Sequence, residues 1–259
     1  MGVYSSVSRQ GQYEPFELQV ARGQIDAHKA LFKFGINGDV GTSVETVWAQ
    51  GGTYAYPAAA TVMKISSSSA DDASAGTGAR SIAIFGLDAN YNEISESVLL
   101  DGQTAVNTGN SYLRISRMYV TTAGSGATAA GTIYAGTGSV TSGVPATVYG
   151  MIALGANQTQ MAFWTVPAGY TLYLTGLFYT SGNTNANAWT NFQLIQRPLG
   201  GVFRQQSSSR VPGNGDFVID FHTPLAFSEK TDIEVRAVAS TSPSNVSAEF
   251  EGIYIKNAD

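Results

Sequence analysis

Two Asp-x-His pairs are the residues of this sequence best placed for acid–base or metal chemistry. Asp26 and His28 form one pair, and Asp220 and His222 form the other. Residues two positions apart on a strand point to the same face, so each pair would present a carboxylate and an imidazole together. A metal site needs further ligands, and neither pair has one nearby in the sequence. We therefore expect both pairs to make structural hydrogen bonds or interface contacts.

A second candidate for chemistry is the segment Asp88–Asn92, which places oxygen-bearing side chains at alternate positions as a calcium loop does. Glu93 stands where an EF-hand requires glycine, and Leu99 stands where it requires a bidentate glutamate. Asp and Asn also favour tight bends. The sequence therefore predicts a turn here, between a strand ending at Phe85 and one beginning near Ile94.

Catalytic machinery is scarce in the rest of the chain. There is no cysteine and there are only 2 histidines, which excludes thiolate nucleophiles and thiolate zinc sites. The sequence contains neither a Gly-x-Ser-x-Gly elbow nor a phosphate-binding loop. Its scattered carboxylates could pair by accident, Glu93, Glu96, Asp101, Glu249 and Glu251 among them. We expect a protein that is not an enzyme and that has no metal site and no cofactor.

The composition limits the classes of partner that the chain is expected to bind. The 259 residues carry a formal net charge of −5, and only 13% of them are charged. A net negative chain lacks the basic surface that neutralises phosphates, so we expect no nucleic-acid partner. No uninterrupted apolar stretch approaches the length that spans a bilayer, so we expect no membrane partner. A surface of this low charge suits contact with other subunits, or with sugars.

Alternation of apolar and polar residues is the main structural signal, and it indicates strands. In the first half it covers Thr61–Ile65, Arg80–Phe85 and Tyr112–Val120. In the second half it covers Thr159–Val166, Tyr170–Tyr179, Thr190–Arg197, Asp232–Ala239 and Ser247–Ile255. The small polar segment Ser66–Gly78 is expected to be an exposed loop. Helical spacing is nearly absent, and the best helical candidate is Val20–Phe34.

Strands of this spacing, separated by Gly, Pro and Asn turns, are typical of sandwiches and jelly rolls. We therefore predict an all-β fold made of two antiparallel β-sandwich (jelly-roll-like) domains with an extended N-terminal arm. The predicted boundaries are 1–35 for the arm, 36–152 for the first domain and 153–259 for the second.

The arm combines aromatic and aliphatic residues with basic ones. Its alternating segments Phe16-Glu17-Leu18 and Phe32-Lys33-Phe34 suit addition to the exposed edge of a partner's sheet. The alternative is that the arm folds back and pairs within its own chain. The residues that we expect at an assembly interface are Phe16, Leu18, Arg22, His28, Phe32 and Phe34.

Several segments of the chain resemble a recurring module of virion structural proteins from tailed bacteriophages, most closely those of marine and cyanobacterial phages. In the first half these are Ile65–Asp72, Gly76–Arg80, Gly86–Glu96, Leu100–Gly102, Tyr112–Ile115 and Gly131–Tyr134. In the second half they are Thr165–Gly169, Arg197–Arg204 and Glu229–Ala237. The resemblance extends over nearly the whole chain and transfers no catalytic residue, because such proteins carry none.

The resemblance implies a component of a virion. The first expectation is a capsid decoration (cement) protein on the outer capsid surface, with the major capsid protein and copies of itself as partners and a trimer as its oligomer. The alternative is a tail fibre, knob or adaptor-associated protein that binds a glycan of the host surface. A weaker alternative is a carbohydrate-active enzyme within one of the sandwiches.

Overall fold

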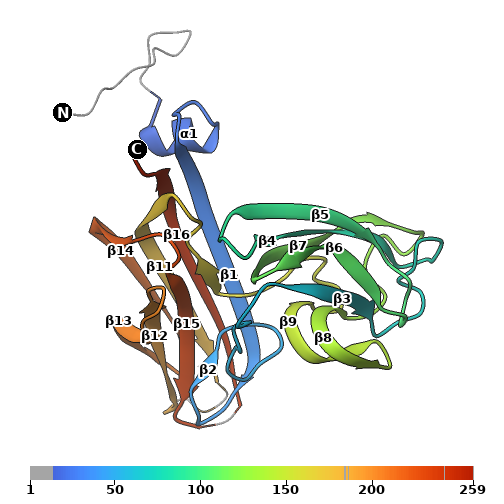
Figure 1. The fold of residues 1–259 in the computed structure, drawn as a ribbon. Coiled ribbons are helices and arrows are strands. Elements are labelled where there is room, and N and C mark those ends of the chain that lie inside the picture. Colours follow the sequence, from blue (N-terminus) through green and yellow to red (C-terminus); the bar gives the residue numbers. More distant parts are fainter. Residues whose placement is uncertain (1–13, 184, 186, 242, 259) are drawn as a thin grey trace.

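The chain folds into two β-sandwiches that lie side by side (Figure 1). The computed structural model describes residues 14–183, 185, 187–241 and 243–258. Within this part, the single helix is α1 (Phe16–Ala21), and every pair of strands is antiparallel. The all-β prediction with antiparallel sheets is confirmed.

We name the sandwich formed by the middle of the chain the first and the other one the second. The second sandwich contains strands from both ends of the chain. Its first sheet has the order β1 (His28–Val40), β16 (Ser244–Lys256), β11 (Tyr170–Gly182) and β14 (Asn214–Phe227). Its second sheet has the order β10 (Phe163–Thr165), β15 (Asp232–Ala239), β12 (Trp189–Arg197) and β13 (Arg204–Pro212), and β2 (Glu45–Thr46) pairs with β15. Strands β1 and β14 are therefore the two edges of the first sheet.

The first sandwich is formed by consecutive strands from the middle of the chain. One sheet has the order β6 (Val106–Tyr112), β3 (Thr61–Ser67), β8 (Ile133–Thr141) and β9 (Val144–Ile152). The other has the order β5 (Glu93–Leu99), β4 (Ala79–Leu87) and β7 (Arg114–Ala123). All pairings of these strands are with one another.

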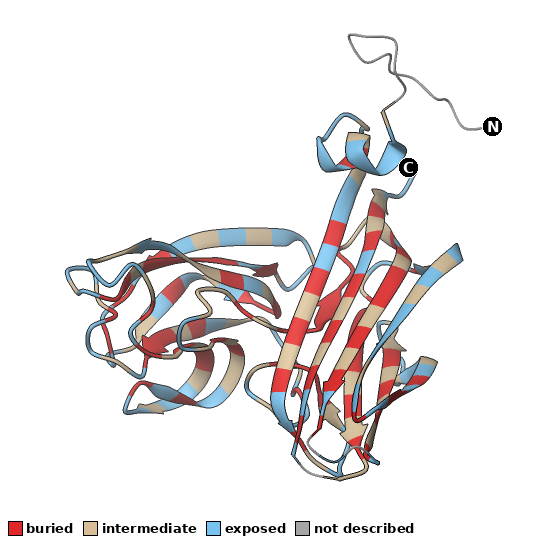
Figure 2. Ribbon diagram, turned by 180° about the vertical axis from the view of Figure 1, so that it is seen from behind, coloured by how far each residue is buried: buried red, intermediate tan, exposed pale blue. Residues whose placement is uncertain are grey.

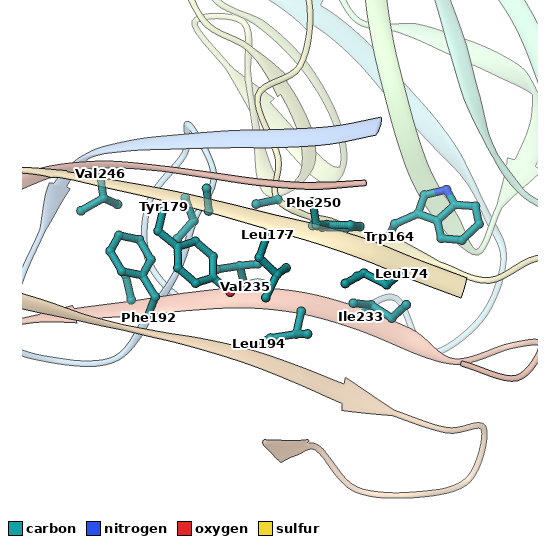
Figure 3. Packing of buried hydrophobic residues seen from close by; sticks show 14 of the residues in the cluster. Trp164, Leu174, Leu177, Tyr179, Phe192, Leu194, Ile233, Val235, Val246 and Phe250 are labelled. Atoms are coloured by element: carbon teal, nitrogen blue, oxygen red, sulfur yellow. The ribbon is translucent and has the colours of Figure 1, made fainter. Parts of the chain in front are cut away.

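Each sandwich has its own core because alternate residues of each strand point inward. In the second sandwich the rings of Tyr179 and Phe192, from opposite sheets, stack with centroids 4.6 Å apart (Figure 3). The first sandwich buries an aliphatic cluster around Ile65, Ile84 and Ile133. Burial of such side chains contributes about 25 cal/mol per Å² of apolar surface and is the main stabilising force of both halves.

A third, aromatic cluster lies where the two sandwiches meet. Trp48 and Tyr54 come from the segment after β2, and Phe163 opens β10. The rings of Tyr54 and Phe163 lie 4.0 Å apart, and Tyr149 of β9 packs against the same cluster. Residues of both sandwiches therefore contribute to one buried contact.

The helix predicted over Val20–Phe34 is wrong. Only Phe16–Ala21 is helical, and the chain becomes a strand at His28. From Leu31 onward buried and less buried residues alternate with a period of two, and the backbone pairs with β16. Tertiary pairing therefore decides the conformation of a segment whose helical spacing is imperfect.

The segment assigned to the arm is continuous with the second sandwich. Pairing with β16 runs from His28 opposite Ile255 to Val40 opposite Ser244. The predicted boundary between residues 35 and 36 falls inside β1, and Leu31 belongs to the buried core. The structure thus has residues 28–40 paired within their own chain, which was the alternative for this segment. The division of the chain into domains stays a prediction.

The loop expected over Ser66–Gly78 is anchored at a buried carboxylate. Asp72 accepts hydrogen bonds from the Ser67 hydroxyl at 2.6 Å and from the backbone nitrogens of Ala79, Ala130 and Gly131 at 2.7–2.9 Å. Four donors compensate the loss of hydration of this charge. The expectation of an exposed loop is therefore wrong at Asp72.

Two neighbouring residues of β1 test this fold. Leu31 packs in the core, whereas Phe32 is 57% exposed on the opposite face. We expect Leu31→Ala to lower the free energy of unfolding by about 2–3 kcal/mol, because it leaves a cavity. Phe32→Ala should change it by less than about 0.5 kcal/mol. Urea unfolding of both variants checks this, and equal losses would contradict the assignment of faces.

Candidate functional site

In the described chain no hydrogen bond joins the carboxylate and the imidazole of either Asp-x-His pair. His28 Nδ1 lies 2.7 Å from the backbone oxygen of Asp26, not from its carboxylate. His222 is exposed in an irregular stretch of β14, where the pairing with β11 shifts between Asp220 and Leu225. In the described part of the chain no three His, Cys, Asp or Glu residues are grouped to hold a metal ion.

The segment Asp88–Asn92 is the predicted turn, linking β4 to β5. The Asp88 carboxylate accepts hydrogen bonds from the backbone nitrogens of Asn90 and Asn92, both at 2.8 Å. Slight burial would raise the pKa of Asp88, but these hydrogen bonds outweigh it and lower the pKa. The oxygen-bearing side chains therefore stabilise a bend.

A buried carboxylate, Asp232 on β15, connects the two sandwiches. Arg114 of β7 donates to both of its oxygens, from Nε at 2.9 Å and from Nη2 at 3.1 Å. Arg197 of β12 donates from Nη2 at 2.6 Å, and the Thr165 hydroxyl donates at 2.6 Å. Burial lowers the pKa of Arg114, but its hydrogen bonds to Asp232 and the charge of Asp232 outweigh this and raise it.

The third nitrogen of Arg114 and one face of each guanidinium group also make contacts. Arg114 Nη1 donates to the carbonyl oxygens of Pro57 and Leu113 at 3.0 and 2.8 Å. The guanidinium carbons of Arg114 and Arg197 lie 4.9 and 4.7 Å from the ring centroid of Tyr56. Hydrogen bonds of this density hold Asp232, Arg114 and Arg197 in a fixed geometry.

Four of the six expected interface residues lie on one side of the molecule. Phe16 of α1 packs edge-on against His28, with ring centroids 5.8 Å apart. Phe32 and Phe34 follow on the outer face of β1, with centroids 6.1 Å apart. Because residues two apart on a strand share a face, His28, Phe32 and Phe34 form one stripe with Phe16 at its end.

Leu18 and Arg22 are not part of this stripe. At 100° per residue they lie on a different side of α1 from Phe16. Leu18 is exposed, and Arg22 forms an exposed ion pair with Glu14.

A groove of about 1180 Å³ runs beside β1, between the two sandwiches. Five consecutive residues, Ala30–Phe34, line it, so the groove borders the edge of the strand as well as its face. On the opposite wall the rings of Phe85 and Tyr119 stack with centroids 5.6 Å apart, beside Arg117. The site is therefore an aromatic groove along a strand edge that no other strand of the described chain occupies.

Lys33 connects β1 to β7 in this groove. Its ammonium donates to the backbone oxygen of Ser116 at 2.5 Å, and its side chain is buried. Burial, and to a smaller extent the charge of Arg117, lower the pKa of Lys33 to about 7. The sequence gives no sign of this, because Lys33 stands between two aromatic residues as a solvent-facing lysine would.

Comparison with known proteins gives only distant structural matches. No protein-family model matches the chain, and no curated protein does. The solved structure of infectious bursal disease virus, Gx strain, has 9% identity and a TM-score of 0.25, covering 98% of this chain and 80% of that one. The VP2 subviral particle of the same virus has 9% identity and a TM-score of 0.19, covering 90% and 77%. Similarity at this level carries no argument about fold or function. No helix of the described chain is long and apolar enough to cross a membrane.

Removing the Asp232 carboxylate should strongly destabilise the fold. We expect Asp232→Asn to lower the free energy of unfolding by about 3–5 kcal/mol, because two guanidinium groups would lose their buried counter-charge. The exposed pair of Arg22 and Glu14 is the control, and Arg22→Ala should cost less than about 1 kcal/mol. Urea unfolding measures both, and a loss below 1 kcal/mol in Asp232→Asn would contradict this role.

Lys33 should make stability depend on pH. Its pKa is about 7 in the folded chain against 10.5 as the ordinary value, so between these pH values the unfolded chain binds more protons. Stability should therefore rise with pH across this window, by at most about 1.4 kcal/mol per pH unit. Lys33→Met should flatten the rise, with its advantage over the parent chain greatest at the acid end. Melting temperatures between pH 6 and 10 test this, with the exposed Lys256→Met as control, and parallel profiles for Lys33→Met and the parent would contradict it.

Proposed function

We propose that this chain is a non-enzymatic structural protein of a bacteriophage virion, and specifically a capsid decoration (cement) protein on the outer capsid surface. The sequence resemblance to virion proteins, which extends over nearly the whole chain, supports the broad class. The contact of the two sandwiches through Arg114 and Asp232 supports the specific role, because a protein that bridges capsid subunits must hold its contact surfaces in a fixed relation.

The observation that carries the proposal is the exposed stripe formed by Phe16, His28, Phe32 and Phe34. Phe32 is 57% and Phe16 is 42% exposed. Large apolar side chains gathered on one face are typical of surfaces that bind another protein. In this proposal the stripe and the adjoining groove contact the major capsid protein, and copies of the chain associate, with a trimer as the expected oligomer.

The alternative role is a tail fibre, knob or adaptor-associated protein that binds a host-surface glycan. The stacked pair of Phe85 and Tyr119 favours it, because Phe85 is 37% exposed in the groove. A flat exposed aromatic ring is a surface on which a sugar ring can pack.

The copy number of the chain in purified virions tests the proposal. A decoration protein follows the capsid lattice and should be present in hundreds of copies, whereas a tail component should be present in about a dozen. Gel densitometry against the major capsid protein measures this. A copy number near a dozen would replace the decoration role by the tail role, and absence from the particle would overturn both.

The stripe is tested by its own variants. Phe32→Ser/Phe34→Ser should reduce binding to particles that lack the protein by at least about tenfold, since contact residues buried at an interface carry most of its binding energy. Val202→Ser removes a 72% exposed apolar residue outside the stripe and should leave binding unchanged. Co-sedimentation measures both, and full binding by the double variant would exclude the stripe as the contact.

A further inference from the structure

The outer face of the first sheet of the second sandwich carries a row of residues that only the strand register brings together. Phe32 of β1 lies opposite Glu251 of β16. Glu251 lies opposite Gly176 of β11, which in turn lies opposite Asp220 of β14. Two carboxylates therefore flank a glycine, with an exposed phenyl ring at the end of the row (Figure 2 shows the alternation of burial along these strands).

The neighbouring row has the same mixed character. Phe34 lies opposite Glu249, Glu249 opposite Phe178, and Phe178 opposite Val218. Val218 is 54% exposed, so apolar surface remains open on this row also. The two rows together hold three carboxylates among aromatic and aliphatic side chains.

Between the rows lies a hollow of about 220 Å³. It is lined by Phe32, Phe178 and Val218 and by the three acidic residues Asp220, Glu249 and Glu251. The missing side chain of Gly176 leaves the floor of the hollow open, since a Cβ atom there would lie 3.1 Å from Glu251 Oε1.

The negative charge of this face is uncompensated within the described chain. The ion pairs of that part use Glu14, Glu93, Asp232 and Glu234. Within the described chain, the carboxylates of Asp220, Glu249 and Glu251 form no ion pair and no side-chain hydrogen bond. The lysines of the same four strands are Lys29, Lys33 and Lys256. Each lies an odd number of positions from the outer-face residues of its own strand, so all three belong to the opposite face of the sheet. The face is therefore apolar and acidic with no lysine or arginine of its own. Its histidines are His28, in the stripe, and His222, two residues after Asp220 in β14.

We infer that this face binds an extended basic segment of a partner protein, with a lysine or arginine side chain of that segment in the hollow. The long alkyl stem of such a side chain packs against Phe32, Phe178 and Val218, and its charged head meets the carboxylates. Anionic partners such as nucleic acid or acidic lipid would be repelled by three like charges. A neutral glycan gains little from unpaired carboxylates.

The free edge of β1 supplies the backbone part of the contact. β1 is the last strand of its sheet, and the groove follows its residues Ala30–Phe34. A segment added to this edge hydrogen-bonds through its main chain and places every second side chain over the outer face. Neighbouring strands lie about 4.8 Å apart, so a lysine or arginine beside β1 extends across Phe32 to the end of the hollow formed by Glu249 and Glu251, and Asp220 adds its charge from the far end. The expected partner sequence therefore alternates basic and apolar residues.

This inference rests on the proposed assembly role of the face, and a peptide test keeps the two separable because it needs no virion. The probe is a fluorescein-labelled peptide of alternating lysine and valine, and binding is read by fluorescence anisotropy. We expect it to bind the full chain, and the binding to weaken as salt is raised. Asp220→Lys/Glu251→Lys should weaken it at least about tenfold.

Matched variants separate the face from overall charge. Asp71→Lys/Asp101→Lys alters net charge equally at two exposed positions of the first sandwich and should change affinity less than about twofold. Asp220→Asn/Glu251→Gln keeps the side-chain shapes and should still weaken binding, which guards against a folding defect in the lysine variant. Equal effects of the two lysine variants, equal binding of a glutamate–valine peptide, or no binding of the lysine–valine peptide would overturn the inference.

Discussion

The buried carboxylate of Asp232 is the constraint on which the arrangement of the two sandwiches depends. It holds Arg114 from the first sandwich and Arg197 from the second at hydrogen-bond distance. Separating the sandwiches would break both hydrogen bonds from Arg114 to this carboxylate, so the ion pair opposes their separation. The groove beside β1 has one wall from each sandwich, and its width follows from this contact.

Much of the fold could be predicted from the sequence, because the alternation of apolar and polar residues that marks a strand is contained within the strand itself. Strands β11 and β16 alternate buried and less buried residues because one face of each packs on a core. The strands that escaped prediction include β6, β8, β9, β13 and β14. Of these, β13 is rich in polar residues, and β13 and β14 are both edge strands with little buried surface. A pattern that reports burial cannot mark a strand that buries little.

The candidate site also contains residues that could be predicted from the sequence and residues that could not. His28, Phe32 and Phe34 could be expected on one face from residue type and from the two-residue period of a strand. The strand expected over Phe16-Glu17-Leu18 is wrong, because these residues form the helix α1. The acidic rows could not, since Glu249 and Glu251 lie far in sequence from Asp220 and meet it only through the register of three strands. Arg114 stands between the apolar residues Leu113 and Ile115 in the sequence. Its burial against Asp232 depends on the docking of the other sandwich, which no local pattern contains.

The pairing of β1 with β16 also sets an order of events during synthesis. His28 leaves the ribosome early, and its partner Ile255 leaves it after nearly the whole described chain has been made. The first sandwich can pair its strands before the rest of the chain has been made, because the strands between Thr61 and Ile152 pair only with one another. The nascent chain is thus expected to carry a folded middle while its first strand stays unpaired. The surface proposed for assembly is completed last, so a nascent chain offers no finished docking face to other molecules.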